Sequence, residues 1–477
     1  MNANQNTNQQ IKNVTVTIIF DGSALNRDEK IGGNILSIKK MKVNGSERSY
    51  LSKPSLRHHL YNTLQTAFEE DWKGAKVTGQ GKVVQFDLTQ DDILSSAELD
   101  AFGYMYTIAG QKSLTRKGPV HITKAVSLFP FETDLAFYAN HDLINRGVKQ
   151  GLDVKPSPYN KEEHSSYYKL SLTIDSKIFG NDEWIIEEKP DYDGENLVIK
   201  IQSPQIATLK EVEKVEEEGN SFFKIGEKKV IIEGQELKVD KGLMREDKKK
   251  ADEEEAPITF DPSFLEGTGR RKPNIKVMSD KYNLNEENQY EFLISKHDYN
   301  GDQKTLRIEI SAVKKIPCKQ SQQIDSGFEI YESENGIIKY KSVQTGGPFQ
   351  ILFELNTKEK KQRIKEVLNT FVSGLEAKSS GEPNTTRPLL IIASGLKVPS
   401  PIFHSFIDME KKSSSIIGIK DCVEKENLWI DGKIYLEDSE KISVAEFLKK
   451  NTKIEPSWQT FVESLGLTED KDETAQN

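Results

Sequence analysis

The feature that most constrains this chain is a strand–helix–strand order that occurs near both ends. Near the N-terminus, residues 14–20 (VTVTIIF) are β-branched and aromatic, which favours a strand. The next helix opens at Pro54, since proline suits a first helical turn, and its apolar stripe is Leu56, Leu60, Leu64 and Phe68. Near the C-terminus, a strand over 349–355, a helix over 358–375 and a strand over 388–393 repeat the order. This pattern predicts an α+β sheet with helices on one face.

Other elements are predicted between these two sets. Apolar alternation predicts strands over 120–128 and 167–174, and the spacing of Ala97, Ala101 and Met105 predicts a helix over 96–108. Residues 22–50 are rich in Gly, Asn and Lys, which predicts a long ordered loop. The dipeptide Asn300-Gly301 predicts a hairpin with arms over 290–295 and 305–313.

The 477-residue chain is acidic on average, but its charge is unevenly distributed. Lys plus Arg number 66 and Asp plus Glu number 75, a net charge of −9. Residues 1–60 hold nine basic and four acidic residues, whereas residues 205–260 hold eleven basic and fifteen acidic ones. Segments of low hydrophobicity such as the latter are typical of solvated faces or disordered loops. A basic surface can therefore exist on the rest of the molecule.

Several classes of protein are disfavoured. No run of 18 apolar residues occurs, so we expect no membrane-spanning helix, and residues 1–10 lack the apolar core of a secretory signal. Cys318 and Cys422 alone predict neither a disulfide scaffold nor a zinc site, and they indicate a reducing cytoplasm. The seven histidines form no HxxxH or HExxH pair, so we predict no metal and no cofactor. The calcium-loop spacing from Asp298 to Glu309 lacks the required glycine and is better explained by a hairpin turn.

Two groups of basic residues are the best candidates for a functional surface. In SKPSLRHHL, Ser52 is a plausible N-cap, and Lys53 and Arg57 share a helix face. The amides and dipole of a helix N-terminus also favour phosphate there. A surface helix with solvated bases explains the same residues about equally well.

The second group lies in KSLTRKGPVHITK and is followed by aromatic residues. Its bases include Arg116, Lys117 and Lys124, and the aromatics include Phe129 and Phe131. Bases interleaved with exposed aromatics suit single-stranded nucleic acid, where phosphates pair and bases stack. The alternative is that these aromatics belong to the core.

At these two groups the sequence resembles the Cas-seven backbone subunit of type I CRISPR surveillance complexes (Cascade), in particular the DevR-like branch of subtype I-B. The similar stretches occur in the family's order and cover roughly half of the chain. They are VTVTIIFDGSALN (14–26), YLSKPSLRHHLYNTL (50–64), FGYM (102–105) with GPVHITKAVSLFPFETD (118–134) and YYKLSLTID (167–175), and RPLLIIASGLKVPSP (387–401).

The resemblance implies a modified RNA-recognition, ferredoxin-like palm. Residues 1–178 would form its N-terminal part, with a thumb hairpin at about 128–165. Residues 348–477 would form its C-terminal part and tail. Residues 179–347 have no clear counterpart in the family, and we expect an insertion that is partly β, partly mobile and acidic.

The resemblance also implies a function. The protein would be a non-catalytic, cytoplasmic subunit that oligomerises along the crRNA within Cascade, beside other subunits, and presents guide bases to target DNA in antiviral defence. Lys53, Ser55, Arg57 and His58 match the family's helix start and would hold guide phosphates, together with Lys39 and Lys40. Segment order alone places Arg116, Lys117 and Lys124 near the nucleic acid, and Phe129 and Phe131 would pack against bases or a neighbouring copy.

Two alternatives remain open at this point. RNA-cleaving type III relatives use a loop aspartate, and Asp21 and Asp28 lie in a predicted loop, although nothing in the sequence marks either as catalytic. We predict no nuclease activity. The other alternative is a protein-binding scaffold that holds no nucleic acid.

Overall fold

The structure is a computed structural model, and it describes most of the chain between residues 10 and 468. The gaps in that range are 24–26, 32–34, 81–82, 109–111, 133, 157, 203–204, 218–219, 247–257, 267–274, 278–280, 326, 380–381 and 411–414. The described chain is a mixed α and β fold, made mostly of strands with few helices. Within it, no helix is both long enough and apolar enough to cross a bilayer.

The largest sheet combines strands from both ends of the chain. β1 (Asn13–Ser23) lies between β14 (Ser165–Ile174) and β37 (Pro388–Leu396) and is antiparallel to both. On the β14 side the sheet continues through β11 (Ala125–Ser127), β5 (Ser46–Leu51) and β4 (Lys40–Val43), while β10 (Val120–Ile122) also pairs with β14. On the β37 side it continues through β40 (Ile430–Asp438) and β41 (Ile454–Glu455). We call this the central sheet.

Each face of the central sheet packs against different helices. Val16 and Ile18 of β1 share a core with α1 (Lys53–Ala67) and α4 (Thr357–Ser373). Ile19 points to the other face, where it packs with Cys422 of α5 (Ile419–Glu424). The strands predicted over 14–20, 167–174 and 388–393 and the two long helices are confirmed here. The strand predicted over 120–128 is divided into β10 and β11, and the one over 349–355 lies in another sheet. The prediction that helices cover one face only is wrong.

Two local predictions in the N-terminal third are also wrong. The expected loop over 22–50 is mostly strand, because short edge strands find distant partners: β5 pairs with β11, and β3 (Ile35–Ile38) pairs with β13 (Tyr159–Glu163). The expected helix over 96–108 ends early, as α2 (Ala97–Phe102), and β8 (Gly103–Tyr106) follows it. Gly103 adopts φ 68°, and a Cβ there would lie 2.4 Å from the Arg116 carbonyl oxygen. Only glycine fits that conformation and that close backbone approach.

A second hydrophobic core joins the segment 88–114 to the first and last strands of the region 179–347. Its sheet runs in the order β15 (Asn181–Ile186), β34 (Phe349–Leu355), β33 (Gly336–Ser342), β32 (Phe328–Glu332) and β31 (Lys319–Asp325). Trp184 and Phe353 pack there with Leu99 of α2 and Tyr104 of β8. This core therefore draws on residues from both sides of position 179.

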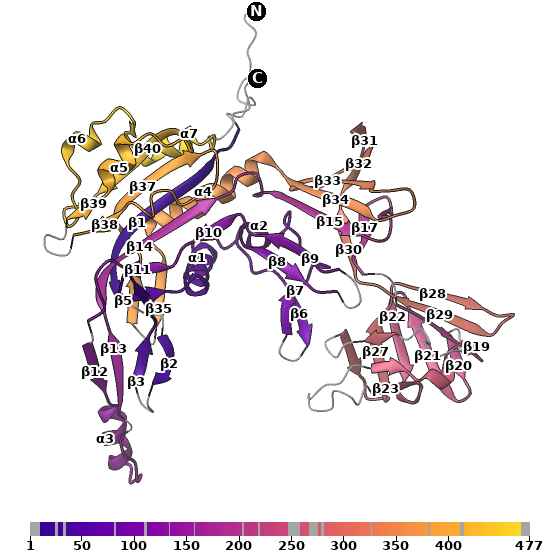
Figure 1. Cartoon of the computed structure of the whole chain (residues 1–477). Helices are drawn as coiled ribbons and strands as arrows, with labels where there is room; N and C mark the ends of the chain where they lie inside the picture. The colour runs from indigo at the N-terminus through magenta and orange to yellow at the C-terminus, as the bar shows by residue number, and fades with distance from the viewer. Residues whose placement is uncertain are drawn as a thin grey trace, which may run out of the picture.

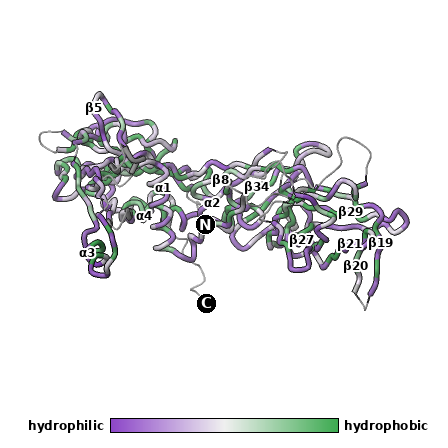
Figure 2. Tube along the Cα trace, turned by 90° about the horizontal axis from the view of Figure 1, so that it is seen from below, coloured by the Kyte–Doolittle hydropathy of each residue, from purple (hydrophilic) through white to green (hydrophobic). Residues whose placement is uncertain are grey.

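Residues 205–310, which we call the distal module, have a core of their own. A six-stranded sheet is formed by β19 (Glu213–Glu217), β20 (Asn220–Ile225), β21 (Lys228–Glu233), β22 (Glu236–Asp240), β27 (Gln289–Leu293) and β26 (Tyr282–Leu284). A narrow neck connects the module to the rest, where the Ile201 amide donates to the Ala312 carbonyl at 2.8 Å. Figures 1 and 2 show the module at one end of an elongated molecule.

The hairpin at Asn300-Gly301 is confirmed, but its first arm is wrong. The arms are β28 (Lys296–Asn300) and β29 (Thr305–Ile310), whereas β27 pairs with β22 and β26. Much of the acidic stretch 246–256 lies outside the described residues.

At the opposite end of the molecule, residues 134–163 project from the central sheet (Figure 1). We call them the arm. β12 (Asp134–Tyr138) and β13 pair antiparallel and flank α3 (His141–Lys149). β3 and β2 (Arg27–Ile31) extend this small sheet.

Candidate nucleic-acid interface

The start of α1 is fixed by its own sequence. The Ser52 hydroxyl accepts a hydrogen bond from the Ser55 amide at 3.4 Å, and Pro54 occupies the first turn. Leu56, Leu60 and Leu64 are buried against the central sheet, which sets the rotation of the helix. The first turn holds no acidic residue. No carboxylate of the first turn therefore competes with a bound anion for the backbone amides at this end.

Three basic side chains of that helix start are exposed together. They are Lys53, Arg57 and His58, and the four-residue spacing places the first two on one face. Ser55 is half-buried and its hydroxyl lies 3.3 Å from His59 Nε2, while His58 Nε2 lies 3.0 Å from the Asn62 amide nitrogen. Burial lowers the pKa of His59, and the adjacent His58 lowers it further. The lowered pKa favours the neutral form of His59.

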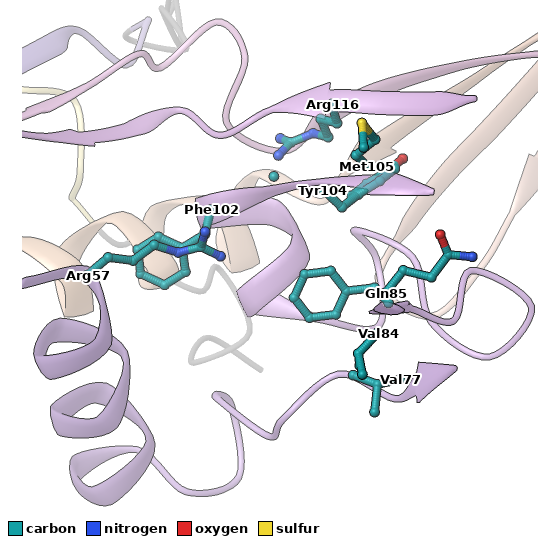
Figure 3. Close-up of a pocket in the computed structure, with 10 residues that line it drawn as sticks. Arg57, Val77, Val84, Gln85, Phe102, Tyr104, Met105 and Arg116 are labelled. Atoms are coloured by element: carbon teal, nitrogen blue, oxygen red, sulfur yellow. The ribbon is translucent and has the colours of Figure 1, made fainter. Parts of the chain in front are cut away.

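Arg57 also borders a groove, shown in Figure 3. Its guanidinium lies 4.9 Å from the centroid of the Phe102 ring. Desolvation lowers the pKa of Arg57, and the nearby Glu98 carboxylate opposes that effect. Figure 3 shows Val77 and Val84 across the groove, on the hairpin of β6 (Val77–Gln80) and β7 (Val83–Phe86).

The groove encloses about 460 Å³ and is lined mainly by apolar side chains. Val77, Val84 and Met105 are among the most exposed large hydrophobic residues, at 60%, 69% and 63%. Val77 and Val84 share a face of the hairpin, because Gly79 pairs with Val84 and lies two residues from Val77. An apolar wall facing an arginine suits a ligand that combines flat apolar surface with negative charge.

Lys39 and Lys40 do not extend this exposed cluster. The Lys40 ammonium lies 3.0 Å from the Glu162 carboxylate and 4.5 Å from the Phe131 ring centroid, so it anchors the base of the arm to β4. Lys39 is half-buried just before β4. Lys40 therefore lies in an ion pair at the base of the arm, apart from the exposed residues of the helix start, and its phosphate contact stays a prediction.

Arg116 is buried, unlike Lys53 and Arg57. Its side chain is only 3% exposed, and its guanidinium lies 2.7 Å from Asp100. It donates further bonds to the carbonyls of Leu99, Ile178 and Asn181. Arg363 of α4 reaches the same Asp100 at 3.2 Å, so this buried network joins α4 to the second core. Lys117 is exposed at the end of β9 (Leu114–Lys117), and Lys124 is half-buried above the Tyr50 ring.

Phe129 and Phe131 pack within their own chain. Phe129 lies 6.3 Å from Tyr167, and Phe131 lies 5.2 Å from His164, between ring centroids. The alternative that they belong to the core is the better description. The exposed apolar side chains lie farther along the arm: Leu135, Phe137, Leu143, Val148 and Leu152. The amphipathic pattern of 141–149, which has no partner in the core, is the sequence signal that could have found them.

The two aspartates considered as nuclease candidates both lie in strands. Asp21 lies in β1, and its carboxylate is 3.0 Å from the Lys441 ammonium. Asp28 lies in β2, and its side chain is outside the described set. Among the described residues, no three His, Cys, Asp or Glu side chains are grouped to hold a metal ion.

Comparisons with solved structures give only weak matches. A chain of a "CRISPR RNA-guided surveillance complex" matches with a TM-score of 0.24 and 14% identity, over 35% of this chain and 51% of that one. A chain of a "CRISPR RNA-guided surveillance complex, pre-nicking" gives 0.26 and 12%, over 35% and 66%. A chain of a "Type IV-B CRISPR Complex" gives 0.22 and 14%, over 34% and 73%. This chain thus matches about half of the first of these, and similarities this low carry no argument.

The comparison with protein families is decisive. Among curated proteins no match is found. The model of the family described as "CRISPR-associated negative auto-regulator DevR/Csa2" matches residues 14–415, which include every element of the central sheet except β40 and β41. The chain therefore belongs to the DevR/Csa2 family of CRISPR-associated proteins.

Proposed function

We propose that this protein is a non-catalytic, crRNA-binding backbone subunit of a type I-B Cascade. It would oligomerise along the guide and present guide bases to target DNA in antiviral defence. The single observation that carries the proposal is the start of α1, where Lys53 and Arg57 are exposed beside capped helix amides and an apolar groove. Phosphates pair with cations and helix N-termini, and bases with apolar walls. The two buried free cysteines agree with a reducing cytoplasm.

The order of strands supports an RNA-recognition-like palm. The chain runs β1, α1, β10 and β11, β14, α4, β37, and the sheet order is β11-β14-β1-β37. A β-α-β-β-α-β chain with its first and third strands at the centre has the ferredoxin-like arrangement. We propose that residues 1–178 and 348–477 supply this palm, that the arm is its thumb, and that 179–347 is an insertion.

The arm supports self-association. Phe137 is 66% exposed, and Leu143 and Val148 of α3 are exposed at similar levels. Exposed apolar surface of this kind marks an interaction site. In a head-to-tail filament, the arm of one copy would bury it against the next copy.

RNA binding can be tested with charge-removing variants at matched positions. Lys53→Gln with Arg57→Gln should weaken binding of the purified protein to single-stranded crRNA. The slope of log affinity against log salt should become shallower by about 1.4, since each single-strand phosphate contact contributes about 0.7. The control is Lys224→Gln with Lys229→Gln, two cross-strand lysines of the distal module. Equal slopes for both variants would contradict the proposal.

The same preparation separates the other two functions. Purification from a host that carries a CRISPR array should give protein with bound RNA, seen as a raised 260/280 absorbance ratio. Protein free of nucleic acid would favour a scaffold. Cleavage of bound RNA that Asp21→Asn or Asp28→Asn abolishes would favour a nuclease.

A further inference from the structure

The second face of the central sheet, opposite α1, is only half covered. On the β1 and β37 side, Phe403, Ile407 and α5 pack onto it. On the β5 and β11 side, the register aligns Tyr50 with Val126 and Val126 with Lys169, so these three side chains form one row on that face. All three are half-buried. Lys169 marks the boundary of the cover, because its ammonium donates to the Ile407 carbonyl at 2.6 Å.

The uncovered half is cationic. Arg48 lies two residues before Tyr50 on the same face of β5, and Lys124 enters the face from the turn before β11. The positions of β4, β5 and β11 in register with Tyr50 carry no carboxylate. They are Met41, Val43, Ser46, Arg48, Tyr50 and Val126, whereas Ser171 and Thr173 of β14 are buried and Asp21 of β1 lies beside Tyr167 on the covered side. Solvated surfaces normally mix both signs of charge, so the two cations of this half, Arg48 and Lys124, favour an anionic ligand.

We propose that this half-open face, centred on Tyr50, is a second binding site for single-stranded RNA. The inference rests on the proposed function and extends the RNA path beyond the start of α1. The Lys124 ammonium lies 4.7 Å from the Tyr50 ring centroid and so occupies the place that a base would take. A lysine side chain is long and flexible, so it can leave the ring for a phosphate while a base stacks on the tyrosine. Arg48 then faces the next phosphate.

The position of Tyr50 makes this second binding site continuous with the first one, at the start of α1. Tyr50 is separated from Ser52, the N-cap of α1, by a single residue. A strand whose phosphates rest on Lys53 and Arg57 therefore reaches the end of β5 and can turn onto the second face. Arg48 is fixed close to that path, since its Nη1 donates to the Ser127 carbonyl at 2.8 Å and also to the Leu128 carbonyl.

The test combines cross-linking with binding by variants of the full chain. A uridine-rich RNA carrying 5-iodouridine is irradiated on the protein, and the linked peptide is identified by mass spectrometry. We expect Tyr50 to be linked. Tyr50→Leu should bind this RNA about tenfold more weakly, the effect of one lost base stack, while Tyr50→Phe should bind as the parent does. Lys124→Gln should lower the salt slope, whereas Lys296→Gln in the distal module should not.

Each outcome decides between the two proposals. In one outcome, Tyr50→Leu and Tyr50→Phe both bind RNA as the parent does and Tyr50 is not cross-linked, while Lys53→Gln with Arg57→Gln still weakens binding. The proposed site at Tyr50 is then wrong, and the proposed site at the start of α1 is supported. If neither set of variants alters RNA binding, both proposed RNA sites are wrong. If Tyr50→Leu unfolds, the Tyr50→Phe cross-link yield and the Lys124→Gln slope decide, because these changes keep the shape of the face.

Discussion

The central sheet and the distal module carry similar kinds of residue but arrange their charges differently. At the start of α1, Lys53 and Arg57 are exposed on one face and neither forms an ion pair with a described carboxylate, although Glu98 lies near Arg57. Lys224 and Lys238 of the distal module, in contrast, lie 3.2 and 3.5 Å from glutamates. A basic residue contributes to an anion site when its neighbours leave its charge unneutralised. The placement of acidic side chains, rather than the number of basic ones, therefore distinguishes a binding surface from a solvated surface.

The largest predicted effect is at the Asp100 network, which joins α4 beside the central sheet to the second core. Asp100→Asn keeps the shape of the side chain but leaves Arg116 and Arg363 buried without their shared carboxylate. Removing one partner of a buried ion pair costs roughly 3–5 kcal/mol. Chemical denaturation should show that loss, with the central sheet and second core unfolding in separate steps. A loss below about 1 kcal/mol, the range of surface pairs, would show that the network is not what joins them.

The next effect tests whether the distal module is an independent unit. Leu60→Ala in α1 and Leu237→Ala in β22 each remove a fully buried leucine, which costs roughly 2–5 kcal/mol of unfolding free energy. Leu60→Ala should lower the melting transition of the central sheet, and Leu237→Ala should lower that of the module alone. Tryptophan fluorescence follows the rest of the chain, because all four tryptophans lie outside the module, and calorimetry follows both transitions. A shift of both transitions by either variant would contradict the separation.

A smaller effect follows from pH. Burial, with help from the Lys169 ammonium, lowers the pKa of His404 from 6.5 to about 4. The unfolded chain takes up this proton below pH 6.5 and the folded chain does not until about pH 4. Stability is therefore full above pH 6.5 and falls as the pH falls from 6.5 to about 4. His404→Gln should weaken the dependence of the melting temperature on pH over this window. His297→Gln, at an exposed position of the module, should leave that dependence unchanged.

The smallest expected effect is on RNA affinity when the module is removed. Ile201 and Ala312 are hydrogen-bonded neighbours, so a short glycine-containing turn can replace residues 202–311. The shortened chain should bind single-stranded RNA with unchanged affinity and salt slope. A large loss of affinity would show that the acidic module contacts RNA or shapes the surface that does.

The sequence predicts the central sheet better than the rest because each of its long elements carries its own signal. β1 and β37 are continuous apolar runs, and α1 and α4 have clear apolar stripes. The distal module alternates lysine or glutamate with apolar residues in short strands, and its pairings depend on residues far away in the chain. Local pattern cannot specify such partners. The same reason explains why residues 22–50 were predicted as a loop.

The candidate site also contains residues that local sequence predicts and residues that it does not. The helix start at Lys53 and Arg57 is local, so its exposure could be predicted from the capping residue and the leucine spacing. Arg116 and Lys40 could not be placed, because their partners Asp100 and Glu162 come close only after folding. Phe137 is the most exposed aromatic residue described in the arm, whereas Phe131, which precedes the arm, packs beneath Lys40.

The most direct test of the central claim is hydrogen–deuterium exchange of the full chain with and without crRNA. We expect slower exchange at the start of α1, over about residues 53–60, and along β5, and no change across β19 to β22 of the distal module. Protection of the module with none at α1 would contradict the claim.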